Sequence, residues 1–384
     1  MTKHNRILNV LKEGDSNGDG WSLELNTSQG RTVFAVAVAQ SVHRSRTGPT
    51  WSYIFENQGW TSIDLGTPGS YDALKVAYST IGLAPSDIKR VIISHGHSDH
   101  DGTVTDFMRD SKAELWAHET YKPLKKYIPW EIHYKKGSLL HKELNRIAEE
   151  KIQPYYEPDA AREATDQKYF EERSQTEVAR DLRDGYELSD LKIMSTPGHS
   201  PDQICLLLDD FIFTGDHILP EITPHPTGKM VFRTSILENL PDFLRDPSEF
   251  YGLGTYLNSL GKVIKLGPNY TILPAHRLYN KSRFNWQGIE RAKQIIKHHE
   301  HRLDSMLNKL QNNTSNLEET TRGIFERSKL LGPNLYAAMS EIVAHLEFLE
   351  DTGDIAIGAS GDISKQGTGT NYKTYISRLV DPNL

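Results

Sequence analysis

The spacing of hydrophobic and polar positions changes twice along the chain. Between residues 20 and 117, short apolar runs alternate with polar turns, and two stretches, 70–81 and 102–109, have the three- and four-residue spacing of a helix. The strands predicted in this part are 22–25, 32–39, 53–56, 61–64, 90–94 and 113–117. Strands interspersed with helices predict an α/β fold.

Residues 119–187 depart from this pattern. They are rich in Lys, Glu, Arg and Tyr, have few aliphatic runs, and show helical spacing at 142–151 and 160–182. The segment is longer than an ordinary connection between neighbouring strands. We interpret it as a helical insertion and expect it to act as a lid that sets specificity and excludes water.

From about residue 290 the pattern is helical. Apolar spacing predicts helices at 288–311, 317–325 and 335–351, followed by two strands, 354–357 and 372–377, around a Gly-rich loop. Three helices followed by a β-hairpin resemble a winged helix. The chain is therefore expected to form a larger domain of residues 1–290, which contains the insertion, and a helical, winged-helix-like domain of residues 291–384.

A cluster of metal-ligand side chains follows the apolar run at 91–93. It comprises His95, His97, Asp99, His100 and Asp101. Imidazole and carboxylate together suit Zn, Fe or Mn, whereas Ca and Mg prefer shells made of oxygen alone. A strand that ends in such a loop predicts a metal site.

Three later positions repeat this design. His199, Asp216 and His276 each lie just beyond a short strand of buried character, next to small or kinking residues. Strand ends that carry His or Asp can meet at one edge of a sheet, which is a common place for a site in a layered α/β fold. These positions suggest a second metal ion.

This ordered set of residues resembles the metallo-β-lactamase superfamily, and within it the glyoxalase-II-like hydrolases, over roughly residues 20–290. The resemblance implies a four-layer αβ/βα sandwich and two metal ions bridged by a carboxylate. The first ion would take His95, His97 and His199, the second Asp99, His100 and His276, and the bridge would be Asp216. One subgroup of these hydrolases also has a C-terminal winged-helix-like domain.

The resemblance implies a dinuclear metal-dependent hydrolase. Two cations about 3.5–4 Å apart can share one water and lower its pKa to roughly neutral, so a bridging hydroxide would be the nucleophile and Asp99 would orient it. The expected cofactor is two Zn²⁺ per chain, although Fe or Mn also suits these ligands. Asp64 and Asp101 are expected to fix His tautomers, and His225 and Arg277 to face the substrate.

The net charge and the composition limit the classes of partner that we expect the chain to bind. The net charge is −7, and residues 318–384 hold six basic and ten acidic residues, which makes nucleic acid an unlikely partner. We expect the C-terminal domain to pack or to form a homodimer instead. No apolar run approaches the roughly 20 residues of a membrane span, no N-terminal leader pattern is visible, and the single cysteine, Cys205, excludes a disulfide framework. These features predict a cytoplasmic enzyme.

Three activities remain open. The resemblance favours hydrolysis of an ester, thioester, lactone or related bond of a small molecule. A metal-dependent nuclease or phosphodiesterase is permitted by the superfamily, but the acidic balance opposes it. A mono-iron sulfur dioxygenase would share the His95–His100 run. The sequence does not name the substrate.

Overall fold

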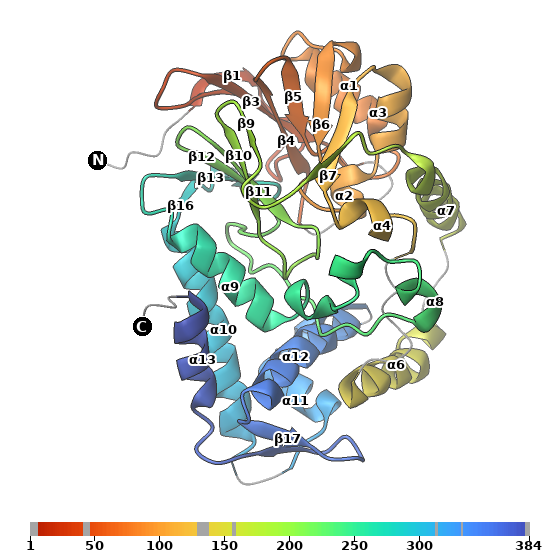
Figure 1. The fold of residues 1–384 in the computed structure, drawn as a ribbon, viewed down its shortest axis with the longest axis vertical. Coiled ribbons are helices and arrows are strands. Elements are labelled where there is room, and N and C mark those ends of the chain that lie inside the picture. Colours follow the sequence, from red (N-terminus) through yellow and green to blue (C-terminus); the bar gives the residue numbers. More distant parts are fainter. Residues whose placement is uncertain are drawn as a thin grey trace.

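The structure is a computed structural model of the 384-residue chain. It describes residues 7–40, 47–128, 138–155, 159–311, 314–331 and 333–380. Two mixed β-sheets lie face to face, and helices cover their outer sides (Figure 1). Within the described ranges, no helix is both long and apolar enough to cross a membrane.

The first sheet has eight strands that are hydrogen-bonded in chain order. They are β1 (Ile7–Lys12), β2 (Ser22–Asn26), β3 (Thr32–Val38), β4 (Thr50–Glu56), β5 (Trp60–Ile63), β6 (Ile88–Ile92), β7 (Glu114–His118) and β8 (Arg180–Leu182). The pairs from β1 to β5 are antiparallel, and those from β5 to β8 are parallel. The predicted strands are confirmed within a few residues, and β1 is one that the sequence pattern did not indicate.

The second sheet has six strands. Their order is β16 (Gln287–Gly288), β13 (Thr271–Pro274), β12 (Phe211–Gly215), β11 (Ile204–Leu208), β10 (Leu191–Ser195) and β9 (Glu187–Leu188). Only β12 and β13 run parallel among these pairs. Two hairpins, β14 (Tyr279–Asn280) with β15 (Arg283–Phe284) and β17 (Ile355–Ile357) with β18 (Ile363–Lys365), lie outside the main sheets.

The alternation along each strand explains why the sheets stack. In β12, Phe211 and Phe213 point into the core between the two sheets, whereas Ile212 points outward to the helices. Successive side chains of a strand point to opposite faces of the sheet. A strand made of apolar residues alone therefore packs into a hydrophobic core on each face. The Phe213 ring stacks on that of Phe55 from the first sheet, with ring centroids 5.5 Å apart.

Helices cover both outer faces. The first sheet packs against α1 and α3 through residues such as Leu74 and Phe107, and the second packs mainly against α9 and α10. The helices up to α8 are α1 (Tyr71–Ser79), α2 (Ser98–Asp101), α3 (Val104–Asp110), α4 (Tyr121–Leu124), α6 (Leu139–Lys151), α7 (Ala160–Gln175) and α8 (Thr234–Leu237). The later ones are α9 (Leu253–Ile264), α10 (Glu290–Lys309), α11 (Leu317–Ile324), α12 (Pro333–Asp351) and α13 (Asn371–Val380). Short 3₁₀ turns occur at η1 (Pro85–Asp87), η2 (Gln153–Tyr155), η3 (Asp242–Leu244), η4 (Pro247–Glu249) and η5 (Arg327–Lys329).

Residues 119–187 contain helices where the spacing predicts them, but these helices lie apart, and the assignment of the segment as an insertion and lid stays a prediction. In Figure 1, α7 lies beside the first sheet near α3, while α6 lies lower, beside α12. The helix predicted at 160–182 ends at Gln175, because residues 180–182 form β8 and pair with β7. Residues 129–137 and 156–158 of the insertion lie outside the described ranges.

The C-terminal region contains the three predicted helices and the first predicted strand. The second predicted strand, 372–377, is wrong, because this stretch lies in α13 and the hairpin partner is β18. Asp354 accepts hydrogen bonds from the backbone N–H groups of Asn371 and Tyr372, which caps the start of α13. Tyr372 and Ile376 then bury one face of it. The winged-helix assignment stays a prediction, as does the domain boundary at 290.

Candidate metal centre

The predicted ligands lie in loops that follow strands of both sheets. His95 and His97 follow β6, and the first turn beyond them is α2, which carries Asp99 and His100. The remaining three ligands come from the second sheet, where His199 follows β10, Asp216 follows β12 and His276 follows β13. The centre therefore forms only when the two sheets stack.

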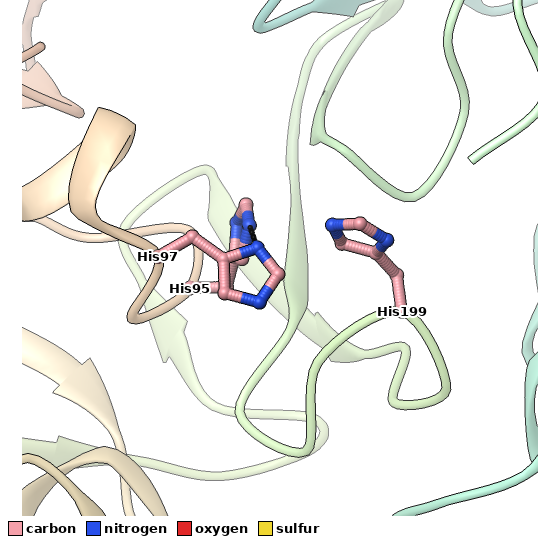
Figure 2. Close-up of side chains that lie close together, drawn as sticks. All are labelled: His95, His97 and His199. Carbon is pink, nitrogen blue, oxygen red and sulfur yellow. Dashed lines mark hydrogen bonds between the residues drawn. The ribbon is translucent and has the colours of Figure 1, made fainter. Parts of the chain in front are cut away.

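One group of candidate ligands comprises His95, His97 and His199. Its ligand atoms all lie within 4.8 Å of one another. Figure 2 shows the His95 and His97 rings from one loop and the His199 ring facing them from another. His95 Nε2 and His97 Nδ1 are 2.9 Å apart. Three converging imidazoles match the nitrogen shell that zinc and related transition metals accept.

A second group comprises Asp99, His100 and His276, and it meets the same criterion. The Nε2 atom of His276 is 3.2 Å from Asp99 Oδ2, and that of His100 is 3.7 Å from Asp99 Oδ1. The mixed carboxylate and imidazole donors of this group differ from the three imidazoles of the first.

Asp216 lies between the two groups. Its Oδ2 atom is 3.7 Å from His199 Nε2, on the side of the first group. Its Oδ1 atom is 3.6 Å from His100 Nε2 and 3.5 Å from His276 Nε2, on the side of the second. One carboxylate thus presents one oxygen to each group.

The far nitrogens of three imidazoles are held by acceptors outside the cluster. His100 Nδ1 lies 2.8 Å from Asp64 Oδ2, so the expected contact of Asp64 with a ligand imidazole is confirmed. His199 Nδ1 donates to the backbone carbonyl of His225 at 2.8 Å, and His276 Nδ1 donates to that of Pro49 at 3.0 Å. Since each Nδ1 carries the proton, each Nε2 is left as a lone-pair donor that points into the cluster.

Burial keeps the first group neutral. It lowers the pKa of His97 to about 3, with His199 as a further cause, and it lowers the pKa of His95 and of His199 in the same direction. Neutral imidazole is the form that binds a metal.

The second group is dominated by its carboxylates. Burial alone would lower the pKa of His100, but Asp64, Asp216 and Asp99 outweigh it and raise that pKa well above its usual value. Burial would raise the pKa of Asp216, but the charges of His276 and His100 bring it to about 2. Ionised carboxylates in a buried pocket attract positive charge, which a metal ion would supply in place of protons.

The lack of hydrogen-bond partners for several candidate ligand atoms is a further reason to expect metal ions. Among the described residues, the Nε2 atoms of His100, His199 and His276 and the Oδ1 atom of Asp216 are buried without a hydrogen-bond partner. Buried polar atoms are nearly always paired, because desolvation without a partner costs roughly 1–3 kcal/mol. Cations held between the two groups would give all four of these atoms a partner.

Comparison with known proteins agrees with this geometry. A family model described as the metallo-beta-lactamase superfamily matches residues 45–276, which is more than half of the chain. The chain belongs to the metallo-beta-lactamase superfamily. The matched range ends at His276, so it contains all seven predicted ligands.

Two solved structures share the superfamily fold along most of the chain. A beta-lactamase domain protein from Burkholderia ambifaria has a TM-score of 0.61 and 18% identity, covering 90% of this chain and 94% of its own. A metallo-beta-lactamase family protein from Thermus thermophilus has a TM-score of 0.59 and 20% identity, covering 87% and 98%. At these identities the likeness shows the fold alone.

A shorter match links the chain to curated relatives. Metallo-beta-lactamase domain-containing protein 1 of Rattus norvegicus is 40% identical over 67 residues, which are 17% of this chain and 26% of that protein. The human protein of the same name is 37% identical over 67 residues. The chain spans about a quarter of the length of these relatives. The glyoxalase-II-like branch stays a prediction.

We call the segment after β6 that carries His95, His97, Asp99 and His100 the metal loop. A buried hydrogen-bond network, which the sequence did not indicate, lies behind it. The Asp101 carboxylate accepts hydrogen bonds from Tyr121 at 2.8 Å, from Tyr169, and from Arg173 Nε at 2.7 Å. Asp101 was expected to fix a His tautomer, and this is wrong, because its oxygens are engaged by these three side chains. Tyr169 and Arg173 belong to α7, so the insertion reaches the metal loop.

Gly96, between two of the ligands, is held at both ends of its backbone. Its carbonyl accepts from Arg173 at 2.8 Å, and its N–H donates to Asp202 at 2.8 Å. A Cβ atom at this position would lie 2.6 Å from the Arg173 guanidinium and 2.9 Å from the Asp202 carboxylate. Any side chain at this position would force one or both of these neighbours to move, and glycine avoids this.

The two residues expected to face the substrate have other contacts. The His225 ring lies 3.3 Å from the carbonyl of Ala337 in α12, and its own backbone carbonyl is the acceptor for His199. Arg277 donates to the carbonyl of Thr47 at 3.0 Å. His225 contacts the candidate ligand His199 through its backbone carbonyl, and Arg277 follows the candidate ligand His276 in the sequence. The role of His225 and Arg277 toward a substrate stays a prediction.

A pocket of about 70 Å³ opens beside His97 and His199. Arg173, Asp202 and Tyr251 contribute to its walls. The pocket therefore brings together two candidate ligands, the residues that hold Gly96, and an aromatic side chain from the segment before α9. Cys205 lies apart from it in the core, and burial raises the pKa of its thiol to about 12, which excludes it as a nucleophile.

Proposed function

We propose that this protein is a dinuclear metal-dependent hydrolase that cleaves an ester, thioester, lactone or related bond of a small molecule. His95, His97 and His199 would hold one ion, and Asp99, His100 and His276 the other. The observation that carries the proposal is the position of Asp216, whose two oxygens face the two groups separately. A carboxylate placed in this way can bridge two cations.

When bound, a pair of ions such as Zn²⁺ would supply a Lewis acid and a water of lowered pKa. The side chains around the ions would orient the attacking water. The side chain of Asp99 is 23% exposed, whereas those of His100, Asp216 and His276 are 8% exposed or less. Asp99 is therefore the ligand of the second group that can reach an entering substrate or water. Its carboxylate would accept a hydrogen bond from the attacking water and orient it.

The pocket beside His97 and His199 is the place for the scissile group. It adjoins the first group of ligands, and it is too small for more than the reacting end of a substrate. Its one arginine, Arg173, already pairs with Asp101, so the pocket has no guanidinium to spare for a phosphodiester among the described residues. This favours an uncharged carbonyl compound over a nucleic acid.

The test is elemental analysis combined with a substrate screen. Purified protein should contain about two Zn per chain and should hydrolyse members of a panel of esters, thioesters and lactones. Replacement Asp216→Ala should remove both ions and the activity, because the bridge belongs to both groups. The matched control Asp72→Ala changes a carboxylate on α1 that is 93% exposed and should keep both.

Three results would contradict the proposal. Two tightly bound ions in Asp216→Ala would show that Asp216 is no bridge. One Fe per chain without hydrolysis would indicate the sulfur dioxygenase alternative. Cleavage of RNA or of a phosphodiester with no turnover of acyl compounds would indicate a nuclease.

A further inference from the structure

A groove of about 680 Å³ lies between residues 229–255 and helices α12 and α13. Its walls include Phe232, Phe348 and Leu379. Val231 and Tyr375, which also line it, are 48% and 47% exposed and are among the large apolar side chains that face solvent. Its volume is in the range of about 300–1,000 Å³ that is usual for small-molecule pockets.

The groove shares one wall with the pocket beside His97 and His199, which we call the metal-side pocket. Tyr251 lines both of them, and its ring packs edge-on against Phe232, with centroids 6.1 Å apart. The next residue, Gly252, donates its N–H to Thr227 Oγ1, and Thr227 lines the metal-side pocket. Tyr251 is therefore a wall both of the pocket beside the candidate ligands and of the apolar groove.

Most charges around the groove have partners within the protein, and the Asp246 carboxylate accepts a hydrogen bond from the backbone N–H of Ser248 at 2.9 Å. Lys229 forms an ion pair with Asp351, and Arg245 forms one with Asp242 at 3.1 Å. Glu347 accepts hydrogen bonds from the Lys229 N–H and from Ser138 Oγ, each at 2.7 Å. A phosphate or a charged peptide would have to break these pairs, whereas an uncharged chain would not. The groove therefore fits a neutral apolar occupant.

We propose that the groove binds the apolar tail of the substrate, which makes the substrate a medium- or long-chain acyl ester, thioester or lactone. This inference rests on the proposed function. The carbonyl lies beside His97 and His199, and the acyl chain passes over the Tyr251 ring into the groove. Phe232 and Phe348 contact the chain there and remove it from water.

The test compares tail binding with chemistry. Dodecanoate is titrated into metal-depleted protein by calorimetry, with shorter fatty acids alongside. Hydrolysis of para-nitrophenyl dodecanoate and para-nitrophenyl acetate is measured on the metal-loaded protein. Because burial of each methylene contributes about 0.8 kcal/mol, Kd should fall about fourfold per added methylene until the groove is full, and kcat/KM should rise with chain length.

Gly254→Leu is designed to fill the groove. A Cβ atom at residue 254 would lie 3.4 Å from the Phe348 ring and 3.9 Å from Leu379, so the side chain can enter without a backbone clash. It should weaken dodecanoate binding at least tenfold and lower kcat/KM for the dodecanoyl ester equally, leaving the acetyl ester unchanged. Val76→Leu, on α1 at the opposite end of the molecule (Figure 1), is the control. Val231→Asp, at a half-exposed position, is the second variant and should act like Gly254→Leu.

Each of the following outcomes contradicts either the groove as the tail site or the proposed function. A chain-length profile that is flat in an active enzyme refutes the groove as a tail site, as does equal loss of both esters in both variants. A homodimer that Val231→Asp dissociates, with no dodecanoate binding, assigns the groove to a second copy of the chain and refutes the proposal. Dodecanoate binding that the variants weaken, in a protein that hydrolyses none of the esters, thioesters and lactones of the panel, supports the groove and contradicts the proposed function instead.

Discussion

Arg173 is the residue through which the insertion reaches the metal loop, and its replacement by Met tests that link. The Arg173 side chain is 4% exposed. Its guanidinium pairs with Asp101 at 2.7 Å and donates to the Gly96 carbonyl at 2.8 Å. Methionine would keep most of the apolar stem and remove both polar contacts, leaving the Asp101 carboxylate buried with its two tyrosine donors.

The size of the effect follows from that geometry. Removing one partner of a buried ion pair typically costs about 3–5 kcal/mol, and the hydrogen bonds that Tyr121 and Tyr169 retain to Asp101 place this case at the lower end. With an unfolding entropy of about 2.1 cal/mol/K per residue, a loss of about 3 kcal/mol corresponds to a Tm shift of about 4 °C for this chain. Metal affinity should also fall, by about 10–100-fold, as for other residues that orient a ligand loop.

Thermal unfolding of metal-free protein followed by circular dichroism measures the first effect, and competition with a chromophoric chelator measures the second. Arg162→Met is the control, because that side chain lies on the same helix, is 55% exposed and makes only a 3.8 Å ion pair. The double variant Arg173→Met/Asp101→Asn should regain part of the stability, since it removes the unpaired charge. A Tm of Arg173→Met within about 1 °C of the parent, or a double variant as unstable as two independent losses, would refute the reasoning.

Three further changes test other contacts. Asp64→Asn, which tolerates the left-handed backbone at that residue (φ 58°), should lower metal affinity at the second group about 10–100-fold, and an unchanged affinity in chelator competition would contradict it. Gly96→Ala should cost about 1–3 kcal/mol in unfolding free energy, since its Cβ would meet the Arg173 guanidinium at 2.6 Å; a Tm equal to that of the parent would contradict the clash. Burial lowers the pKa of His345 to about 4, so its contribution to stability is complete above pH 6.5 and is lost as the pH falls toward 4. His345→Gln should therefore lose about 2 kcal/mol less than the parent between pH 7 and 5 in urea unfolding, and parallel losses would contradict the assignment.

Much of the fold was predictable because burial imposes a short-range pattern. The apolar run through Phe211–Phe213 belongs to a strand with both faces covered, and the helical spacing at 70–81 belongs to a helix with one. The candidate ligands were recognisable for a related reason. Each lies in the loop or first helical turn that follows a strand, and a strand end is visible in the sequence as the place where apolar residues give way to polar ones.

Where the prediction failed, distant residues decided the local structure. The stretch 372–377 contains β-branched and aromatic residues that favour a strand locally. It becomes helical because Asp354, 18 residues before Tyr372, caps the first turn of α13, and because Tyr372 and Ile376 are buried on one face of that helix. Residues 180–182 continue a helical pattern in the sequence but pair with β7. A neighbouring strand with unpaired backbone groups outweighs a weak local propensity.

The sequence by itself determined the order of the ligands, the chemical type of each donor and the strands that end beside them, because these depend on residue identity and on patterns a few residues long. The family resemblance implied how the candidate ligands divide into two groups with Asp216 between them, but the tertiary structure alone brings these side chains together. It alone also decided that Arg173 rather than Arg162 reaches the metal loop. Two arginines on one helix differ only in what packs against them. That contact joins residues 72 positions apart, and no local pattern encodes a partner at such a distance.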